Sequence, residues 1–513
     1  MKKTYSALLG LLLIVLPLAE AFAQATTSVN TARRGTNLPS NILDVRADYG
    51  ALCNNEADDL AAITAAVERA VVLRGATILI PAICRVSSTI QVNGSNISFL
   101  GHGPTISQIR ITSAAVPALV FGNGTTDYNF NFVDGVGITS TVSRTAGGTG
   151  VRFSRIGVGG YYRGYIANQH RGIEIIDGSG LIKVGDSRIV DPTSGAGSGI
   201  YIDAAVEPQL FNLTIACVTG AQPFAAVHMA AANGFRLENV DSVGCGSGLA
   251  MAPGPGQIIE HGFLARNSFD GGSGSGILMN AVRGATIRAI TATGDWATSN
   301  GDNGVVTTGA GTIQGIEING LRAMNNINHG AIFSSGTDIR ISGGLYAGNS
   351  LGSSGARDGI LFDGISGFSV IGARSGQAAG NPGKQRYGIA VTSVGSDNYV
   401  LADNDVRSNA TAGMLLASAI GATRLVTGNL GHVTANKAIS TGLRTDSSGD
   451  VTISHGLAGT PVQVWAQLKG TTAAYILNPH TYGATTFKIR VYDAAGAAVA
   501  TTAIDPVAWK AEQ

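Results

Sequence analysis

A short pattern repeats eleven times along the middle of the chain and constrains the fold more than any other feature. Each copy begins with glycine or alanine, continues with an apolar residue and any residue, and ends in most copies with another apolar residue. The copies begin at Gly150, Gly172, Gly199, Ala226, Gly248, Gly276, Gly304, Gly330, Gly359, Gly388 and Gly413. Subtracting successive start positions gives steps of 22 to 29 residues, which is the range of stacked-coil architectures.

A second segment of alternating apolar and polar residues follows the copies, as in 235–240 and 368–371. Alternation with period two predicts strands with one face inward and one outward. Strands without intervening helices argue against leucine-rich and helical solenoids, and a β-sandwich would not keep one step length over eleven copies. We therefore predict an all-β chain, a right-handed parallel β-helix with an N-terminal helix cap and a small C-terminal β-sandwich.

The first residues have the layout of a secretory signal. Lys2 and Lys3 precede an apolar run over 7–18, and a small-residue cleavage site follows at 21–23, so residues 1–23 are expected to be removed and 24–41 to form an arm. No later segment predicts a membrane span, and we expect a secreted or periplasmic protein. A net charge of +1 gives no electrostatic reason to expect nucleic acid as a partner.

In-register coils stack like residue on like residue, so polar residues at one position should form a ladder. About 18 to 21 residues beyond each start the chain has Asn168, Asp191, Cys217, Cys245, Asn267, Asp295, Asn325, Asn349 and Asn409, with Gly376 as the odd member. Asn and Asp tolerate left-handed turns. We therefore interpret Asp191 and Asp295 as ladder residues rather than catalysts.

The four cysteines predict two disulfides. Cys217 and Cys245 fall at one ladder position in adjacent coils, and Cys53 and Cys84 form the second pair, near the N-terminal cap. The cysteine spacing does not suit zinc. No metal site or cofactor is predicted, and nothing specific indicates calcium.

A helix over 60–73, ended by Gly75, precedes a buried strand over 77–80 and leads into the first coils. A helix there would cover the open end of the β-stack. With the coils, this cap is expected to make one domain over 42–420.

The cap resembles the pectate-lyase superfamily of parallel β-helices, which includes phage tailspike-like proteins. The motifs are Val45-x-x-Asp48-Tyr49-Gly50-Ala51, Asp58-Asp59-x-x-Ala62-Ile63, Ile78-x-Ile80-Pro81 and Leu100-Gly101-x-Gly103. Departures place Cys53 and Cys84 where the family usually has glycine-containing turns. The resemblance implies a fold shared by lyases, hydrolases, epimerases and binding proteins, so it does not name the chemistry. The paired aspartate motifs of polygalacturonases are missing, and we interpret His102 as structural.

Polar residues directly before successive starts suggest a site. If register holds, an exposed column contains Asp302 with Asn303, then His329, Asp358, and Arg386 with Tyr387. Asp302 and Asp358 could serve as the two carboxyls of an inverting glycosidase. Alternatively, His329, Tyr387 or Arg386 could act as the base of a lyase. The residues expected to bind substrate are Trp296, Asp270, Asn303 and Lys384.

Residues 434–513 predict a small antiparallel β-sandwich and resemble the terminal modules of phage tail fibres. That resemblance implies trimerisation, here a homotrimer, or glycan binding. The whole chain is expected to be an exported carbohydrate-active protein that cleaves an extracellular or capsular polysaccharide by lyase or hydrolase chemistry. The alternative is a non-catalytic glycan-binding adhesin or a prophage tailspike-like surface fibre.

Overall fold

A computed structural model describes residues 41–193, 195–217, 222–376, 384–393, 395–416, 423–469, 475–504 and 506–512. The expected signal peptide, and all of the expected arm except Asn41, lie outside these residues. The chain divides into two units, 1–42 and 43–513, and the account below concerns the second. Among the described residues, no helix is long and apolar enough to cross a bilayer.

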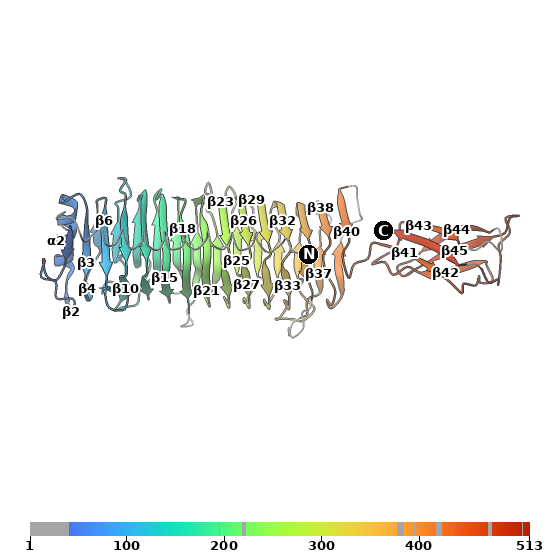
Figure 1. The fold of residues 1–513 in the computed structure, drawn as a ribbon, viewed down its shortest axis with the longest axis horizontal. Coiled ribbons are helices and arrows are strands. Elements are labelled where there is room, and N and C mark those ends of the chain that lie inside the picture. The colour runs from blue at the N-terminus through green and yellow to red at the C-terminus, as the bar shows by residue number, and fades with distance from the viewer. Residues whose placement is uncertain are drawn as a thin grey trace, which may run out of the picture. The chain divides into compact units, whose positions relative to one another are not determined.

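A sheet of thirteen parallel strands runs along the coils (Figure 1). Its strands, in spatial and chain order, are β5 (Ile90–Val92), β8 (Leu119–Phe121), β11 (Thr149–Ser154), β14 (Arg171–Ile176), β16 (Gly195–Ile202), β19 (Pro223–Met229), β22 (Ser247–Met251), β25 (Ile277–Asn280), β28 (Val305–Thr308), β31 (Ala331–Phe333), β34 (Ile360–Phe362), β37 (Tyr387–Val391) and β39 (Ala412–Leu416). The eleven repeat copies are the strands from β11 onward, one copy per strand.

The register of this sheet follows the repeat. The residue after each leading glycine pairs with its counterpart one coil away, as Val151 does with Ile173 and Ile277 does with Val305. These side chains point inward and are 0–1% exposed. The prediction of an in-register parallel β-helix is therefore confirmed, and the third residue of every copy must point outward.

The other solenoid strands belong to one 27-stranded sheet. They are β1 (Ile42–Asp44), β2 (Asn54–Asp58), β3 (Ala76–Ile80), β4 (Ile83–Val86), β6 (Ile97–Gly101), β7 (Gln108–Ile111), β9 (Asn131–Asp134), β10 (Gly137–Ser140), β12 (Val158–Tyr162), β13 (Tyr165–Ala167), β15 (Leu181–Val190), β17 (Ala205–Val206), β18 (Gln209–Ala216), β20 (Ala232–Asn233), β21 (Arg236–Val243), β23 (Ile258–Ala265), β24 (Ser268–Asp270), β26 (Thr286–Thr293), β27 (Trp296–Thr298), β29 (Thr312–Asn319), β30 (Arg322–Met324), β32 (Thr337–Ser342), β33 (Leu345–Ala347), β35 (Ser366–Ile371), β36 (Arg374–Ser375), β38 (Asp397–Ala402) and β40 (Arg424–Thr427).

The expected polar ladder exists, but it divides between two corners of the coil. Asn267 is buried between β23 and β24, and Asp295 is buried between β26 and β27 in the next coil. The side chain of Asn267 donates a hydrogen bond to Asp295 at 2.9 Å. A second ladder follows β27, β30 and β33, where Asn326 donates to Asn349 at 2.9 Å. Asn325, which we expected in this ladder, is instead the left-handed corner residue, with φ 56°. The prediction of a single ladder is therefore wrong. Each corner has a residue with left-handed backbone, and the residue after it has the buried polar side chain.

Both predicted disulfides are present. Cys53 and Cys84 join β2 to β4 near the cap, and Cys217 and Cys245 join adjacent coils with a Cα–Cα distance of 4.9 Å. The amide of Cys217 donates to the carbonyl of Val243 at 2.9 Å. Cys245 therefore lies one residue beyond the position that stacks directly on Cys217, and the disulfide spans this offset.

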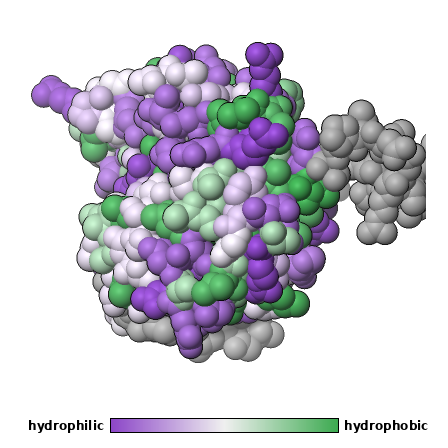
Figure 2. Space-filling view, turned by 90° about the vertical axis from the view of Figure 1, so that its left-hand side faces the viewer, coloured by the Kyte–Doolittle hydropathy of each residue, from purple (hydrophilic) through white to green (hydrophobic). Residues whose placement is uncertain are grey.

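Helix α2 (Leu60–Val72) packs against β3, β5 and β6 at the end of the stack and buries Ile63, Ala66, Val67 and Ala70. Asp59 accepts backbone N–H bonds from Leu52, Cys53 and Arg85. It thereby fixes the loop over the first coil. Hydrophilic and hydrophobic residues are interspersed at this end of the molecule (Figure 2), as expected for an end closed by a helix.

The C-terminal segment forms two three-stranded antiparallel sheets around one core, as predicted. One contains β41 (Ala435–Ser440), β46 (Val507–Glu512) and β43 (Gln463–Leu468), and the other contains β42 (Asp450–Ser454), β45 (Thr486–Tyr492) and β44 (Ile476–Tyr482). Trp509 is buried in this core against Phe487.

Candidate functional site on the thirteen-stranded sheet

The polar column expected before the repeat starts does stack in register. The amide of Gly304 donates to the carbonyl of His329 at 3.0 Å, that of Gly330 to Asp358 at 3.3 Å, and that of Gly359 to Tyr387 at 2.9 Å. The expected exposure is wrong, because His329 is 5% exposed, Asp358 0% and Asn303 7%.

The column is buried because its side chains satisfy backbone groups of the next coil. Asn303 accepts from the amide of His329 at 3.0 Å, and the Nδ1 atom of His329 accepts from the amide of Asp358 at 3.0 Å. Asp358 in turn accepts from Tyr387 at 3.3 Å and from both Nε and Nη2 of Arg386, at 2.9 and 2.7 Å. Burial lowers the pKa of His329 to about 4, so the ring is neutral.

Asp302 belongs to a neighbouring column. Its carboxylate accepts from Ser275 at 2.9 Å and from Asn328 at 2.8 Å. Both oxygens of Asp358 are bound by Arg386, and its side chain has no exposed surface. These two carboxylates therefore hold the coils together and do not face a common open gap.

The residues expected to bind substrate are not gathered on one surface. Trp296 is 43% exposed on β27, with the guanidinium of Arg322 4.8 Å from its ring centroid. Asp270, on β24 of the same 27-stranded sheet, accepts from the hydroxyl of Thr298 at 3.0 Å. Lys384 is exposed before β37, and Asn303 is buried in the column just described.

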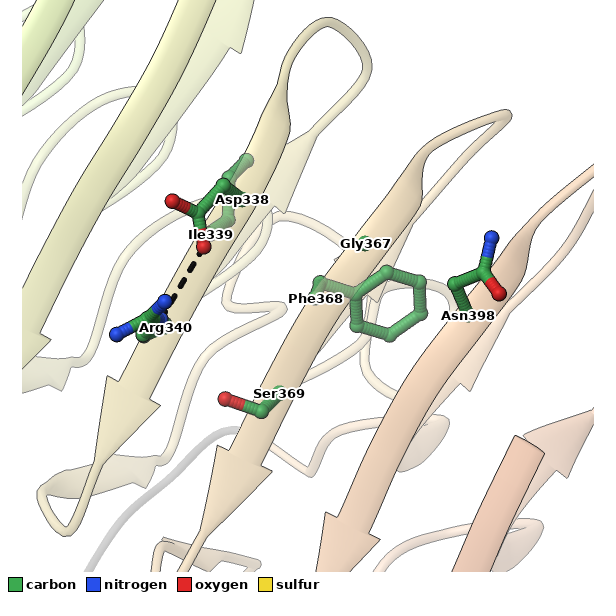
Figure 3. Close-up of a pocket in the computed structure, with 7 residues that line it drawn as sticks. All are labelled: Asp338, Ile339, Arg340, Gly367, Phe368, Ser369 and Asn398. Carbon is green, nitrogen blue, oxygen red and sulfur yellow. Dashed lines mark hydrogen bonds and ion pairs between the residues drawn. The ribbon is translucent and has the colours of Figure 1, made fainter. Parts of the chain in front are cut away.

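A hollow of about 230 Å³ lies on the 27-stranded sheet. Figure 3 shows its lining residues on three neighbouring strands, with Phe368 between Arg340 and Asn398. Asp338 and Arg340 already pair with each other at 3.1 Å. The hollow therefore offers a shallow surface, and its charged groups are engaged.

A different group of residues lies on the outward face of the thirteen-stranded sheet. The third residues of four consecutive repeat copies pair in register, in the order Arg152, Glu174, Tyr201 and His228. Each stands between inward-facing residues that are 0% exposed, such as Ile173 and Ile175 beside Glu174. We call these four residues the polar row.

Glu174 links two arginines of this face. Its Oε2 accepts from Arg152 at 2.6 Å and its Oε1 accepts from Arg171 at 2.7 Å. The Arg171 guanidinium carbon lies 3.6 Å from the centroid of the Tyr201 ring. A guanidinium on an aromatic face is held by cation–π attraction, so Arg171 is fixed between a carboxylate and a ring.

Tyr201 and His228 are the acid–base groups of the polar row. Their ring centroids are 5.1 Å apart, and the Tyr201 hydroxyl donates to Asp203 at 3.3 Å. Burial, followed by the charge of Asp203, raises the pKa of Tyr201 to about 12. Burial, followed by the positive charge of Arg171, lowers the pKa of His228 to about 4. At neutral pH the phenol therefore keeps its proton and the imidazole is neutral.

Two polar atoms beside the polar row, Arg171 Nε and His228 Nδ1, are buried and have no hydrogen-bond partner among the described residues. Buried polar groups are nearly always paired, so two such atoms beside charged side chains indicate a place where water or a ligand completes the bonds. Phe224, 38% exposed, lies 4.7 Å from the His228 ring and adds an apolar surface.

The sequence interpretation missed this group, although the signal was present. The repeat was written with any residue at its third position, and that position holds the polar row. Counting which copies have a charged or titratable residue there would have found Arg152, Glu174, Tyr201 and His228. Arg171 and Asp203 flank the same copies.

No family model and no curated protein matches the sequence. Among solved structures, the A-module of mannuronan C-5 epimerase AlgE6 from Azotobacter vinelandii is similar, with a TM-score of 0.53 and 15% identity over 76% of this chain and 98% of that one. A mutant tailspike protein of E. coli bacteriophage HK620 in complex with pentasaccharide has a TM-score of 0.56 and 11% identity, over 92% and 94%. The tailspike protein of HK620 in complex with pentasaccharide has a TM-score of 0.50 and 11% identity, over 92% of this chain and 94% of that one.

Both kinds of neighbour have the right-handed β-helix fold of the pectate-lyase superfamily. The expected right-handed parallel β-helix fold is thereby confirmed. At these identities the likeness shows the fold alone.

Proposed function

We propose that the chain is an exported carbohydrate-active protein that binds an acidic polysaccharide along the outward face of β11, β14, β16 and β19 and cleaves it by lyase chemistry. The observation that carries the proposal is the polar row with its unpartnered atoms, Arg171 Nε and His228 Nδ1. The printed names of the structural neighbours, a mannuronan epimerase and a tailspike bound to a pentasaccharide, support a polysaccharide as the ligand. Two disulfides support export.

Cleavage by elimination needs three groups in one place. A cation must neutralise the carboxylate of the sugar, a base must remove the proton from the carbon beside it, and an acid must protonate the departing oxygen. Arg171 has a free Nε and supplies the cation. His228 is neutral and offers its imidazole as the base, and Tyr201 keeps its proton and supplies the acid.

The step balances without a further reactant. His228 takes the proton from the carbon next to the carboxylate, and the electron pair of that C–H bond forms a C=C bond to the neighbouring carbon. The bond from that carbon to the glycosidic oxygen breaks, and Tyr201 gives its proton to the oxygen. Binding of an anionic sugar beside His228 would raise the pKa of the imidazole and make it a stronger base.

Hydrolysis has less support at this face. A glycosidase needs two carboxyls that flank the bond to be cut, one of them free to give or take a proton. Glu174 is 3% exposed and held by two guanidinium groups. Asp203 accepts from Gln257 at 2.9 Å as well as from Tyr201.

Binding without turnover is the second candidate function. It is favoured by the ion pairs of Glu174 with Arg152 and Arg171, which hold this surface rigid. Such a surface suits a glycan-binding fibre as well as an enzyme.

The test uses the purified chain with alginate, polygalacturonate and hyaluronan, and follows absorbance near 235 nm, where the new C=C bond conjugated to the carboxylate absorbs. Cleavage of one polymer, lost in His228→Ala and in Tyr201→Phe, is the expected result. His261→Ala is the matched control, because His261 is exposed on the 27-stranded sheet, where it contacts Asn233. Binding without any absorbance change supports the second candidate, and cleavage that survives in both variants contradicts the proposed site.

A further inference from the structure

Three aromatic rings lie in a row on the outward side of the 27-stranded sheet, in the coils that also contain the first strands of the polar row. Phe132 on β9 and Tyr162 on β12 have ring centroids 6.3 Å apart, and Tyr162 and Phe211 on β18 are also 6.3 Å apart. All three side chains are half-buried. The interplanar angles, 32° and 49°, show tilted rings rather than a closed stack.

Two glycines make room for these rings. A Cβ atom on Gly185 would lie 2.2 Å from the Phe211 ring, and one on Gly160 would lie 2.7 Å from the Tyr162 ring. Both rings therefore lie close over the backbone of these glycines, where any larger residue would push them away. Aromatic side chains that serve only as core point inward, whereas these cover the outer surface of strands whose inward residues, such as Val184, are 0% exposed.

Planar polar groups flank the rings. Asp134 pairs with Arg163, and Asp186 accepts from Asn212 at 3.0 Å, which in turn accepts from Asn239 at 3.0 Å. Burial and the negative charges of Asp134 and Asp186 raise the pKa of Tyr162, so both carboxylates lie near its hydroxyl.

We propose that Phe132, Tyr162 and Phe211 form a platform for a neutral glycan, separate from the polar row. Sugar rings have flat C–H faces that stack on aromatic rings and hydroxyl edges that need planar acceptors and donors beside them. The rings of the platform supply the stacking surface, and Asp134, Asp186 and Asn212 supply the hydrogen-bonding groups beside it. Arg163 neutralises Asp134, so these groups supply no excess of positive charge to hold a polyuronate, and we take the ligand to be uncharged. Such a platform would hold the protein on a neutral matrix while the polar row meets an acidic polymer.

The experiment is affinity electrophoresis of the full chain in native gels containing hydroxyethylcellulose, dextran or alginate. We expect retardation by one of the two neutral polymers, with the dissociation constant raised about tenfold in Tyr162→Ala and in Phe211→Ala, because central aromatic anchors dominate such contacts. Tyr162→Phe keeps the ring and should weaken binding by less than about threefold. Phe263→Ala is the matched control, since Phe263 is a 40% exposed ring on the same sheet, with Arg236 beside it.

Five outcomes decide the proposal. Retardation that is lost in Phe211→Ala but kept in Tyr162→Phe and Phe263→Ala supports it, with unchanged melting temperatures as evidence that the variants fold. Lack of retardation by both neutral polymers overturns it, as does equal loss in Phe263→Ala. Unchanged neutral-polymer binding in both alanine variants overturns it as well. Binding to alginate tests whether the platform is separate from the polar row, and a change in alginate binding in Phe211→Ala would contradict this separation. A lack of lyase activity leaves the platform proposal unaffected.

Discussion

The outward row of the thirteen-stranded sheet has two halves with the same backbone and opposite chemistry. In β11 to β19 its residues are Arg152, Glu174, Tyr201 and His228, and in the later strands they are Ala250, Leu278, Val306, Ile332, Leu361, Ala390 and Leu415. Strand pairing continues through both halves, and the row itself stays in register, with one shift between Gly195 and Ser198 where β16 pairs with β19. The repeat therefore specifies how the coils stack, whereas its third position, which the fold leaves free, determines the chemistry of the surface.

The largest expected effect separates His228, on β19, from His329, which lies just before β31. His228→Ala removes the proposed base from the polar half, and activity on the polyuronate that the protein cleaves should fall by about 100-fold or more. His329→Ala removes a buried hydrogen bond from the apolar half and should lower the melting temperature while the rate per folded molecule stays within about threefold. Rates at 235 nm, measured at a temperature where both variants are folded, check this prediction. Equal losses of rate would remove the distinction between the halves.

The disulfide at the junction of the halves should contribute the next largest effect. Cys217–Cys245 closes a loop of 28 residues and joins the segment after β18 to the segment after β21, which leads into β22, the first strand of the apolar half. In Cys217→Ser/Cys245→Ser the free energy of unfolding should fall by about 3–4 kcal/mol, because the unfolded chain gains freedom. Urea denaturation measures the change. A loss below about 1 kcal/mol would show that the junction is held by its strands alone.

Asp295 tests whether a polar group inside the apolar half affects stability without affecting function. Burial raises the pKa of this carboxyl to about 6, above the ~3.9 of an unfolded chain. The folded state therefore holds the proton more tightly, so this group favours folding most below about pH 4 and loses that contribution as the pH rises to about 6. The two-unit difference corresponds to about 3 kcal/mol.

Asp295→Asn should abolish that dependence. Asn404 and Asn429 make the same ladder contact with amides, so an asparagine fits the position. We expect the variant to be more stable than the parent by about 2–3 kcal/mol at pH 8 and nearly equal at pH 4, by urea denaturation at both values. If the difference in free energy of unfolding between parent and variant is the same at pH 4 and at pH 8, the Oδ2 atom of Asp295 is not buried and unpaired as described.

The smallest effect is expected for Ile332→Ser, at the same row position in the apolar half. Because Ile332 points outward and is only half-buried, the free energy of unfolding should change by about 1 kcal/mol or less. Activity and glycan binding should stay at the parent level in the same assays. A large loss of either would mean that the apolar half belongs to the binding surface.

Much of the fold followed from the sequence because backbone packing repeats. A small residue at each strand start and, in most coils, two inward apolar residues recur, so the eleven copies predicted the strands and their register. The cysteine positions predicted both disulfides. The corner ladders were harder to assign. Asn325 and Asn326 are adjacent, and only the left-handed φ at Asn325 shows which of them turns the chain and which is buried.

The site could not be predicted in the same way. Asp302, His329 and Asp358 look like exposed loop groups, because sequence spacing does not show that each accepts a hydrogen bond inside the stack. Contacts such as the Arg171 guanidinium over Tyr201, or Gln257 reaching Asp203 from 54 residues away, depend on coils being brought together. Alternation marks the third residue of each copy as outward, but it does not show which residues of other coils contact it.

The most direct test of the central claim is a crystal structure of the His228→Ala protein with a short oligomer of the polyuronate that the parent binds. We expect a sugar ring over β14, β16 and β19, with its carboxylate within hydrogen-bond distance of Arg171 and its ring near Tyr201. Sugar density beside Asp302 and Arg386, or against Trp296, with the polar row empty, would contradict the assignment of function to the polar half.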